Sequence, residues 1–373
     1  MTLEVIYVTR HGFRSNWLVD HTNGNYSAML RSPTGIAADP ALTAHGVEQA
    51  RELGDRLLAA DPPIERVYSS PYYRCLQTVE PFVRKRAASL LETTAGIATT
   101  SSTAVRLENG IGEWYGAAPF EHPVPASHDK LASLFPAMLD REYKAAVVPP
   151  RTGEGIDELH DRVSATMEAL VAECDRDGVR AVLLCSHAAV IIALGRVLTG
   201  DMPDSIDVED FRAFTCGLSV YRRRRRRRQR QGFVEGETAA AAAAAVSGGW
   251  DGGTAPATGA AAAAAAAAAK TWTNTTTSAS IQAAETVDHH AEGWRRGRGV
   301  SGGWDCELNS DCAHLSSGEE RGWRFSGDES FTDVAKKESM LDIDAGAHLG
   351  VVVEGRKTTR PSSKETGGGG SRL

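Results

Sequence analysis

The chain has 373 residues, a length that allows about two domains, and a net charge of -7 that is unevenly distributed along it. Its six cysteines form no paired framework, so we expect reduced thiols and exclude a disulfide-stapled secreted domain. No apolar run reaches transmembrane length, and no basic-then-apolar signal peptide precedes the strand pattern that follows Met1. The composition therefore predicts an intracellular protein of the nucleus and cytoplasm that neither enters a membrane nor is secreted.

Strand and helix patterns alternate through the first part of the chain. Residues 3–9 have the β-branched character of a buried strand, and a loop rich in Asn, Gly and Pro follows from 20 to 40. Thr43 fits the N-cap of a helix whose apolar residues recur at helical spacing. The later predicted elements are strands at 64–69, 181–186 and 216–221 and helices at 159–174 and 188–198.

This alternation predicts an α/β fold with three layers, α/β/α, around a mostly parallel central sheet. Ligands of such sheets bind at the carboxyl ends of the strands. His11 and His187 each follow a predicted strand directly, so we expect both imidazoles at that edge.

The stretch from Val5 to Arg14 is the most informative part of the sequence. An apolar strand ends there in a glycine turn that carries one imidazole, of His11, and two guanidiniums, of Arg10 and Arg14. Arginines match phosphate oxygens bidentately, and a neutral histidine can attack phosphorus. The pattern therefore indicates a phosphate site.

Six blocks of the sequence, in one order between Leu3 and Tyr221, resemble the histidine phosphatase (phosphoglycerate-mutase-like) superfamily. They are Arg10-His11-Gly12 after its strand, Leu42 to Ala50, Ser69-Ser70-Pro71 with Arg74, Gly112-Glu113-Trp114, Gly153-Glu154 and Ser186-His187-Ala188. We interpret residues 1–221 as a histidine phosphatase-like domain on this resemblance.

The resemblance also implies the roles of the site residues. The catalytic residues would be His11 as phosphoryl acceptor, Glu113 as acid and then base, and His187 as a cationic donor. Arg10, Arg14, Arg74 and His187 would bind the phosphoryl group. No metal and no cofactor is implied, and a carboxyl pressed against a phosphate should have a raised pKa.

Arg14 separates two branches of this superfamily, because mutases usually carry a serine at that position. The arginine, together with Gly112-Glu113-Trp114, looks more like the protein-tyrosine-phosphatase-like and steroid-phosphate phosphatases. We therefore favour a phosphomonoesterase for phosphotyrosine-like or small phosphoesters. A phosphoglycerate mutase-like metabolic enzyme remains the alternative.

Regular patterns end after Tyr221. Residues 222–270 hold an arginine run and two polyalanine tracts, which predict a disordered linker. The run Arg222 to Arg230 fits nuclear import or non-specific contact with a nucleic-acid backbone, and a solvated linker is the other interpretation.

The segment 271–335 is rich in tryptophan, which predicts a short β-rich tail that docks on a partner, and 336–373 reads as disordered. Residues 304–308 and 315–325 look like two short strands around a turn. This tail and the first domain together resemble the fungal TFIIIC subunits that carry a histidine phosphatase domain. The resemblance implies RNA polymerase III transcription, with a larger TFIIIC subunit bound through 271–335.

Two hypotheses follow from these observations. The chain is an active phosphatase on a TFIIIC subunit, or it is a catalytically silent phosphatase fold that serves as an assembly scaffold. Deletion from Thr271 onward should leave turnover intact under the first hypothesis and abolish recovery of the partner under the second. Cys306, Cys312 and His314 lack the close cysteine pair of a zinc site, so the sequence disfavours zinc there.

Overall fold

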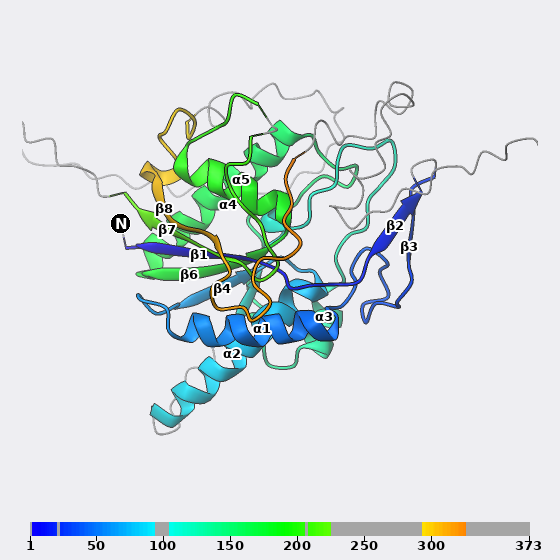
Figure 1. Ribbon diagram of the computed structural model, residues 1–373, viewed down its shortest axis with the longest axis horizontal. Coiled ribbons are helices and arrows are strands. Elements are labelled where there is room, and N and C mark those ends of the chain that lie inside the picture. The colour runs from blue at the N-terminus through cyan, green and yellow to red at the C-terminus, as the bar shows by residue number, and fades with distance from the viewer. Residues whose placement is uncertain (1, 21–22, 94–103, 206–207, 225–292, 326–373) are drawn as a thin grey trace, which may run out of the picture. The chain divides into compact units, whose positions relative to one another are not determined.

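The computed structural model describes residues 2–20, 23–93, 104–205, 208–224 and 293–325 (Figure 1). The predicted linker from 225 onward, the start of the tail and the last segment, 336–373, lie outside these residues.

A six-stranded sheet with the order β5-β4-β6-β1-β7-β8 runs through the centre of the fold. β1 pairs in parallel with β6, and β4 pairs in parallel with both β6 and β5. β7 is antiparallel to β1, and β8 is antiparallel to β7, so the sheet is mostly parallel as predicted. The strands are β1 (Val5–Arg10), β4 (Arg66–Ser69), β5 (Val105–Leu107), β6 (Ala181–Ser186), β7 (Leu218–Arg223) and β8 (Trp304–Asp311).

Helices cover both faces of this sheet, which confirms the predicted three layers (Figure 1). Alternate residues of β1 point to opposite faces, since Val5 and Tyr7 join one core cluster while Ile6 and Val8 join the other. The Val5 side packs on α1 (Ala44–Leu58), α2 (Tyr73–Thr93) and α3 (His128–Leu134), and the Ile6 side packs on α4 (Ile156–Asp177) and α5 (Ala188–Thr199). The described residues also form two 3₁₀ turns, η2 (Asn109–Ile111) and η3 (Val300–Gly302).

The predicted N-cap at Thr43 is confirmed, because its side chain accepts a hydrogen bond from Gly46 N at 3.1 Å. The loop predicted over 20–40 is in part a hairpin of β2 (Trp17–Asp20) and β3 (Asn25–Ala28). Its Asn23-Gly24 pair, with Gly24 at φ 72°, is the usual signal for such a turn. No helix among the described residues is long and apolar enough to cross a membrane.

The described part of the tail belongs to the same sheet as the first domain. One strand, β8, forms there instead of the two predicted, and residues 312–325 continue without strand structure. β7 also runs to Arg223, so the arginine run begins inside the sheet. Ion pairs join its first three arginines to carboxylates of the described fold: Arg222 to Glu307, Arg223 to Asp175 and Arg224 to Asp305, at 2.6, 2.8 and 2.7 Å.

The tail aromatics that we expected to meet a partner are buried in this chain's own core. Trp304, Trp294 and Phe325 are at most 1% exposed, and Trp323 is 5% exposed. All four belong to the cluster formed by α4, α5 and the sheet. Burial of these rings removes the exposed apolar surface on which the prediction of a partner depended.

Candidate active site

The carboxyl ends of neighbouring parallel strands bring the two predicted histidines together. His11 follows β1 and His187 follows β6, and their ring centroids lie 5.3 Å apart. Arg74 lies in the first turn of α2, directly after β4, and Glu113 follows the turn η2. Blocks that are far apart in the sequence thus come together in space, because β4, β6 and β1 are neighbours in the sheet.

His11 is 2% exposed and its ring orientation is set by the backbone. Its Nδ1 lies 2.9 Å from the carbonyl oxygen of Gly12, which can only accept, so Nδ1 carries the proton and Nε2 keeps the lone pair. Burial and the neighbouring Arg74 and Arg10 lower the pKa of His11 well below its ordinary value. The imidazole is therefore neutral at physiological pH and bears its lone pair on Nε2.

The turn that carries His11 lies directly against the start of α1. A Cβ atom added at Gly46 would come within 2.0 Å of the Phe13 carbonyl oxygen, and one at Gly12 within 2.8 Å of the Gly46 oxygen. Only residues without a side chain permit this approach. The Leu42-to-Ala50 block therefore supports the turn that holds the nucleophile candidate.

Arg74, Glu113 and His187 form a tight charged cluster. Arg74 Nη2 donates to Glu113 Oε2 at 2.7 Å, and His187 Nδ1 lies 3.1 Å from the same oxygen. Arg74 Nη1 is held by the Ala38 carbonyl and by Asp39 Oδ1, at 3.0 and 3.2 Å. The Arg74 side chain is fully buried, so its planar fork is fixed before any ligand arrives.

Arg10 and Arg14 complete the cationic ring. Burial lowers the pKa of Arg10 to about 10 and that of Arg14 to about 9, so both remain charged at neutral pH. Arg14 Nη1 donates to the Ser15 carbonyl at 3.0 Å, and its guanidinium lies 6.0 Å from the Trp17 ring centroid. Three guanidiniums thus surround the two imidazoles.

The pKa of Glu113 differs from our expectation. Burial by itself raises it, but His187, Arg74 and Arg14 together hold it well below its usual range. The expected raised pKa belongs to a carboxyl that faces a phosphate, whereas the groups that face Glu113 within the protein are cationic. Glu113 is therefore an ionised proton acceptor in this state.

His187 is held from both sides of its ring. Its Nε2 lies 2.7 Å from Ser70 Oγ, and its Nδ1 faces Glu113. Burial lowers the pKa of His187, but Cys75 and Glu113 more than offset that effect, so the pKa is raised above its ordinary value. The ring is thus cationic in mildly acidic solution, with Nδ1–H directed at the site.

Ligand atoms of His11, Glu113 and His187 lie within 4.8 Å of one another, a spacing that could hold a metal ion. Arg10, Arg14 and Arg74 repel a cation at this place and attract an anion. The arrangement is therefore suited to a phosphate rather than to a metal.

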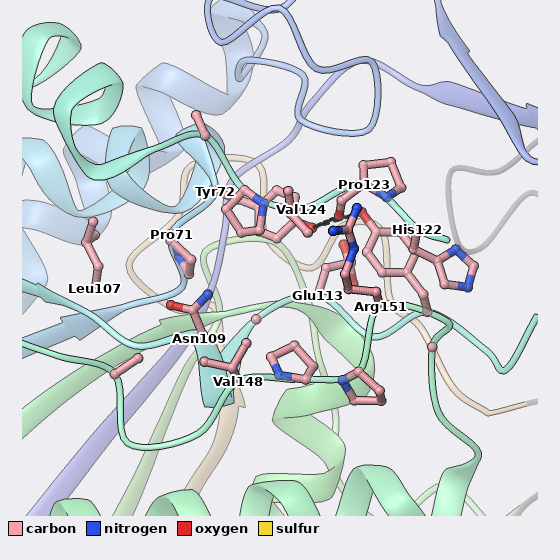
Figure 2. Close-up of a pocket in the computed structure, with 18 of the residues that line it drawn as sticks. Pro71, Tyr72, Leu107, Asn109, Glu113, His122, Pro123, Val124, Val148 and Arg151 are labelled. Atoms are coloured by element: carbon pink, nitrogen blue, oxygen red, sulfur yellow. Dashed lines mark hydrogen bonds between the residues drawn. The ribbon is translucent and has the colours of Figure 1, made fainter. Parts of the chain in front are cut away.

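A cavity of about 430 Å³ adjoins Glu113. Figure 2 shows Glu113 with the mainly apolar and aromatic side chains that line it, among them Tyr72, Val124 and Val148. The cavity's arginine, Arg151, is already paired with Glu121 at 2.5 Å. Such a wall is suited to an apolar group attached to a bound phosphate.

Several residues that support this site were not predicted from the sequence. Ser70 lies in the Ser69-Ser70-Pro71 block without a predicted function, and no motif surrounds the fully buried Asp39. Glu154 forms a buried ion pair with Arg162 at 2.5 Å, and its carbonyl accepts from Trp114 Nε1 at 3.0 Å. These bonds anchor the residue that follows Glu113, and only the tertiary structure shows them.

Cys306, Cys312 and His314, the residues considered for zinc, each bond a different backbone carbonyl. His314 Nε2 bonds the Cys216 carbonyl at 3.1 Å, while Cys306 and Cys312 bond the carbonyls of Leu308 and Ser310 at 3.2 and 3.4 Å. Within the described part of the chain they form no metal-binding group.

The fold and this cluster define an α/β protein with a cationic, histidine-bearing pocket at the carboxyl edge of its sheet. Residues 6–235 match the histidine phosphatase superfamily (branch 1), which is more than half of the chain. The chain belongs to that superfamily.

The chain is similar to a transcription factor subunit and to phosphatases. The chain is 36% identical to the transcription factor tau 55 kDa subunit of Saccharomyces cerevisiae over 230 residues, 59% of this chain and 48% of the relative. It is 29% identical to the ecdysteroid-phosphate phosphatase of Drosophila melanogaster over 221 residues, 54% of this chain and 27% of the relative. The chain thus spans about half or less of these proteins' lengths. A crystal structure of the Bombyx mori ecdysone phosphate phosphatase with tungstate covers 59% of this chain and 89% of its own, at 22% identity and a TM-score of 0.42.

Proposed function

We propose that this chain is a phosphomonoesterase that works through a phosphohistidine on His11. The observation that carries the proposal is the His11 ring itself, neutral and with its lone pair on Nε2 inside a ring of arginines. In the first step Nε2 bonds to phosphorus, the ester P–O bond breaks, and the leaving oxygen takes a proton from Glu113. In the second step water attacks phosphorus, Glu113 takes the water's proton, and the His11–phosphorus bond breaks.

Glu113 is ionised before substrate binds, so the proton for the first step has to come with the substrate. A phosphate monoester has a second pKa near about 6, and its monoanion brings one proton into the site. Once bound, the phosphate's negative charge opposes that of Glu113 and raises the carboxyl's pKa, so the proton can move to Glu113.

The cavity beside Glu113 supports a substrate with an apolar or aromatic leaving group. Val124 and Val148 line it and are exposed enough to contact a ligand, and Tyr72 and Tyr115 line it as well. A mutase-type substrate brings a second phosphate that needs cations, whereas the described residues that line the cavity include one arginine, Arg151, and no lysine. These features favour a phosphotyrosine-like ester over a phosphoglycerate.

Hydrolysis of p-nitrophenyl phosphate by the full chain tests this proposal. We expect kcat/KM to be highest in mildly acidic solution and to fall as pH rises above about 6, where the substrate becomes a dianion. A further fall should follow at higher pH, where His187, whose pKa is raised above its ordinary value, loses its proton. On the acid side activity should persist, because the depressed pKa keeps His11 neutral well below pH 6.5. A rate that only rises toward alkaline pH would contradict this assignment.

The likeness to the yeast tau subunit supports a second proposal, assembly with a larger TFIIIC subunit. We predicted that contact in 271–335, but the aromatic side chains between 294 and 325 are buried in this chain's own core. β8 is the last strand of the described sheet, so its outer edge is where a partner strand could pair. Nucleic-acid contact, proposed for Arg222 to Arg230, now depends on 225–230, since three arginines are ion-paired.

Co-expression with the larger TFIIIC subunits tests the assembly proposal. We expect the full chain and its His11→Ala variant to recover the partner equally. The proposed docking edge is on β8, and β7 separates β8 from β1, the strand that His11 follows. Failure of the folded full chain to recover any TFIIIC subunit would overturn the proposal.

A further inference from the structure

The tail segment 320–325 contacts the residues that hold the phosphate site. Arg10 Nη1 donates to the carbonyl of Ala213 at 2.7 Å and also to the carbonyl of Arg321. The guanidinium of Arg321 lies 4.3 Å from the Phe13 ring centroid. A residue more than 300 positions along the chain thus holds a guanidinium of the phosphate site.

Glu320 anchors this segment to the support of the His11 turn. Its Oε2 lies 2.5 Å from His45 Nε2 and accepts from Gln49 Nε2 at 2.7 Å. Gln49 Oε1 in turn accepts from the backbone N–H of Phe13 at 3.0 Å. The Glu320 carbonyl also accepts from Thr215 N at 3.1 Å. One amide side chain therefore links the tail to the turn that carries His11.

The end of the same segment packs beside Glu113. The ring centroids of Trp323 and Phe325 lie 6.5 and 5.6 Å from that of Trp114, the residue after Glu113. Both rings are buried in the α4–α5 core. The segment 320–325 therefore touches the supports of a phosphate-binding group at one end and of the carboxyl at the other.

We propose that Glu320 and Arg321 are positioning residues of the phosphate site, which keep Arg10 in the orientation that binds the anion. Two carbonyls hold Nη1, while the buried Nε of Arg10 has no hydrogen-bond partner among the described residues. That N–H is a donor which the protein itself does not use, and an anion can satisfy it. The expected effect on turnover rests on the proposed function. The expected effect on anion binding does not, because anion binding can be measured without turnover.

The test compares Glu320→Ala with Glu319→Ala. Glu320 is 31% exposed, so its truncation leaves the core intact, and Glu319 is the matched neighbour. The Glu319 carboxylate is bound by Arg212 at 2.6 and 2.9 Å rather than by a residue of the phosphate site. We expect Glu320→Ala to weaken orthovanadate binding and to raise KM for p-nitrophenyl phosphate, each roughly 10-fold, because the guanidinium shifts. Glu319→Ala should change neither value.

Glu320→Gln keeps an oxygen that accepts from Gln49, so it should restore most of the vanadate affinity. A merely structural role would lower the melting temperature of Glu320→Ala and leave the affinity and KM of the folded protein unchanged, which would overturn the inference. A wild type that binds vanadate without turnover would end the proposed enzyme function alone. A folded wild type that binds no vanadate would overturn both.

Discussion

Replacing His11 by alanine is expected to reduce the hydrolysis of p-nitrophenyl phosphate by about 10³-fold or more. The substitution removes the ring nitrogen that would bond to phosphorus, and the described site holds no second neutral imidazole, since His187 is cationic in acid. Orthovanadate should still bind, because Arg10, Arg14 and Arg74 remain. Steady-state rates and vanadate titrations of both proteins measure the two effects separately.

His314→Ala is the matched control for this experiment. His314 is half-buried, and its Nε2 bonds the backbone carbonyl of Cys216 at 3.1 Å rather than a side chain of the charged cluster. The control should retain full turnover. Equal rates for wild type and His11→Ala would contradict the phosphohistidine mechanism. No turnover in a folded wild type would instead favour the scaffold hypothesis.

Ending the chain at Arg224 is expected to unfold the phosphatase domain, in contrast to our expectation from the sequence that deletion from Thr271 leaves turnover intact. The truncation removes β8 and four buried aromatic rings from the core. Loss of one buried Trp or Phe side chain costs about 3–5 kcal/mol, and a domain's whole stability is about 5–15 kcal/mol. Circular dichroism and urea unfolding of the truncated chain would show the loss.

Two controls test whether the loss of stability comes from removing β8 and the buried rings rather than from shortening the chain as such. A chain that ends at Phe325 keeps every described element and should unfold at the urea concentration of the full chain. Trp304→Ala, within that shorter chain, should lose about 3–5 kcal/mol of unfolding free energy, while Met29→Ala, 96% exposed, should change it by less than about 0.5 kcal/mol. A truncation at Arg224 with an unchanged midpoint would show that the tail contributes nothing to the core.

The candidate site was predictable to the extent that its residues lie in local patterns. Arg10 ends β1, His11 and Arg14 follow it closely, and His187 follows β6, so strand ends alone place them at one edge. Asp39 and Ser70 could not be assigned in this way. Asp39 accepts hydrogen bonds from Tyr73 N and Arg74, and Ser70 bonds His187, all of them distant in sequence, and no periodicity records such bonds.

For the tail, the sequence predicted that apolar surface is buried but not what that surface packs against. Its tryptophans correctly indicated that the segment buries apolar surface, but composition cannot say against what that surface packs. The ion pairs of Arg222, Arg223 and Arg224 with carboxylates, and the pairing of β8 with β7, resolve the question in favour of the chain's own sheet.

The sequence by itself determined the α/β class, the order of the strands and helices around the site, and which charged residues and histidines lie at the carboxyl edge of the sheet. Alternation of strand and helix patterns and the blocks from Arg10 to His187 carry that information locally. Only the tertiary structure decided that Glu113 is ionised, that His11 is neutral with its lone pair on Nε2, and that the tail is the sixth strand. Those properties depend on burial and on charges brought together across the fold, because a pKa and a packing partner are set by neighbours in space rather than in sequence.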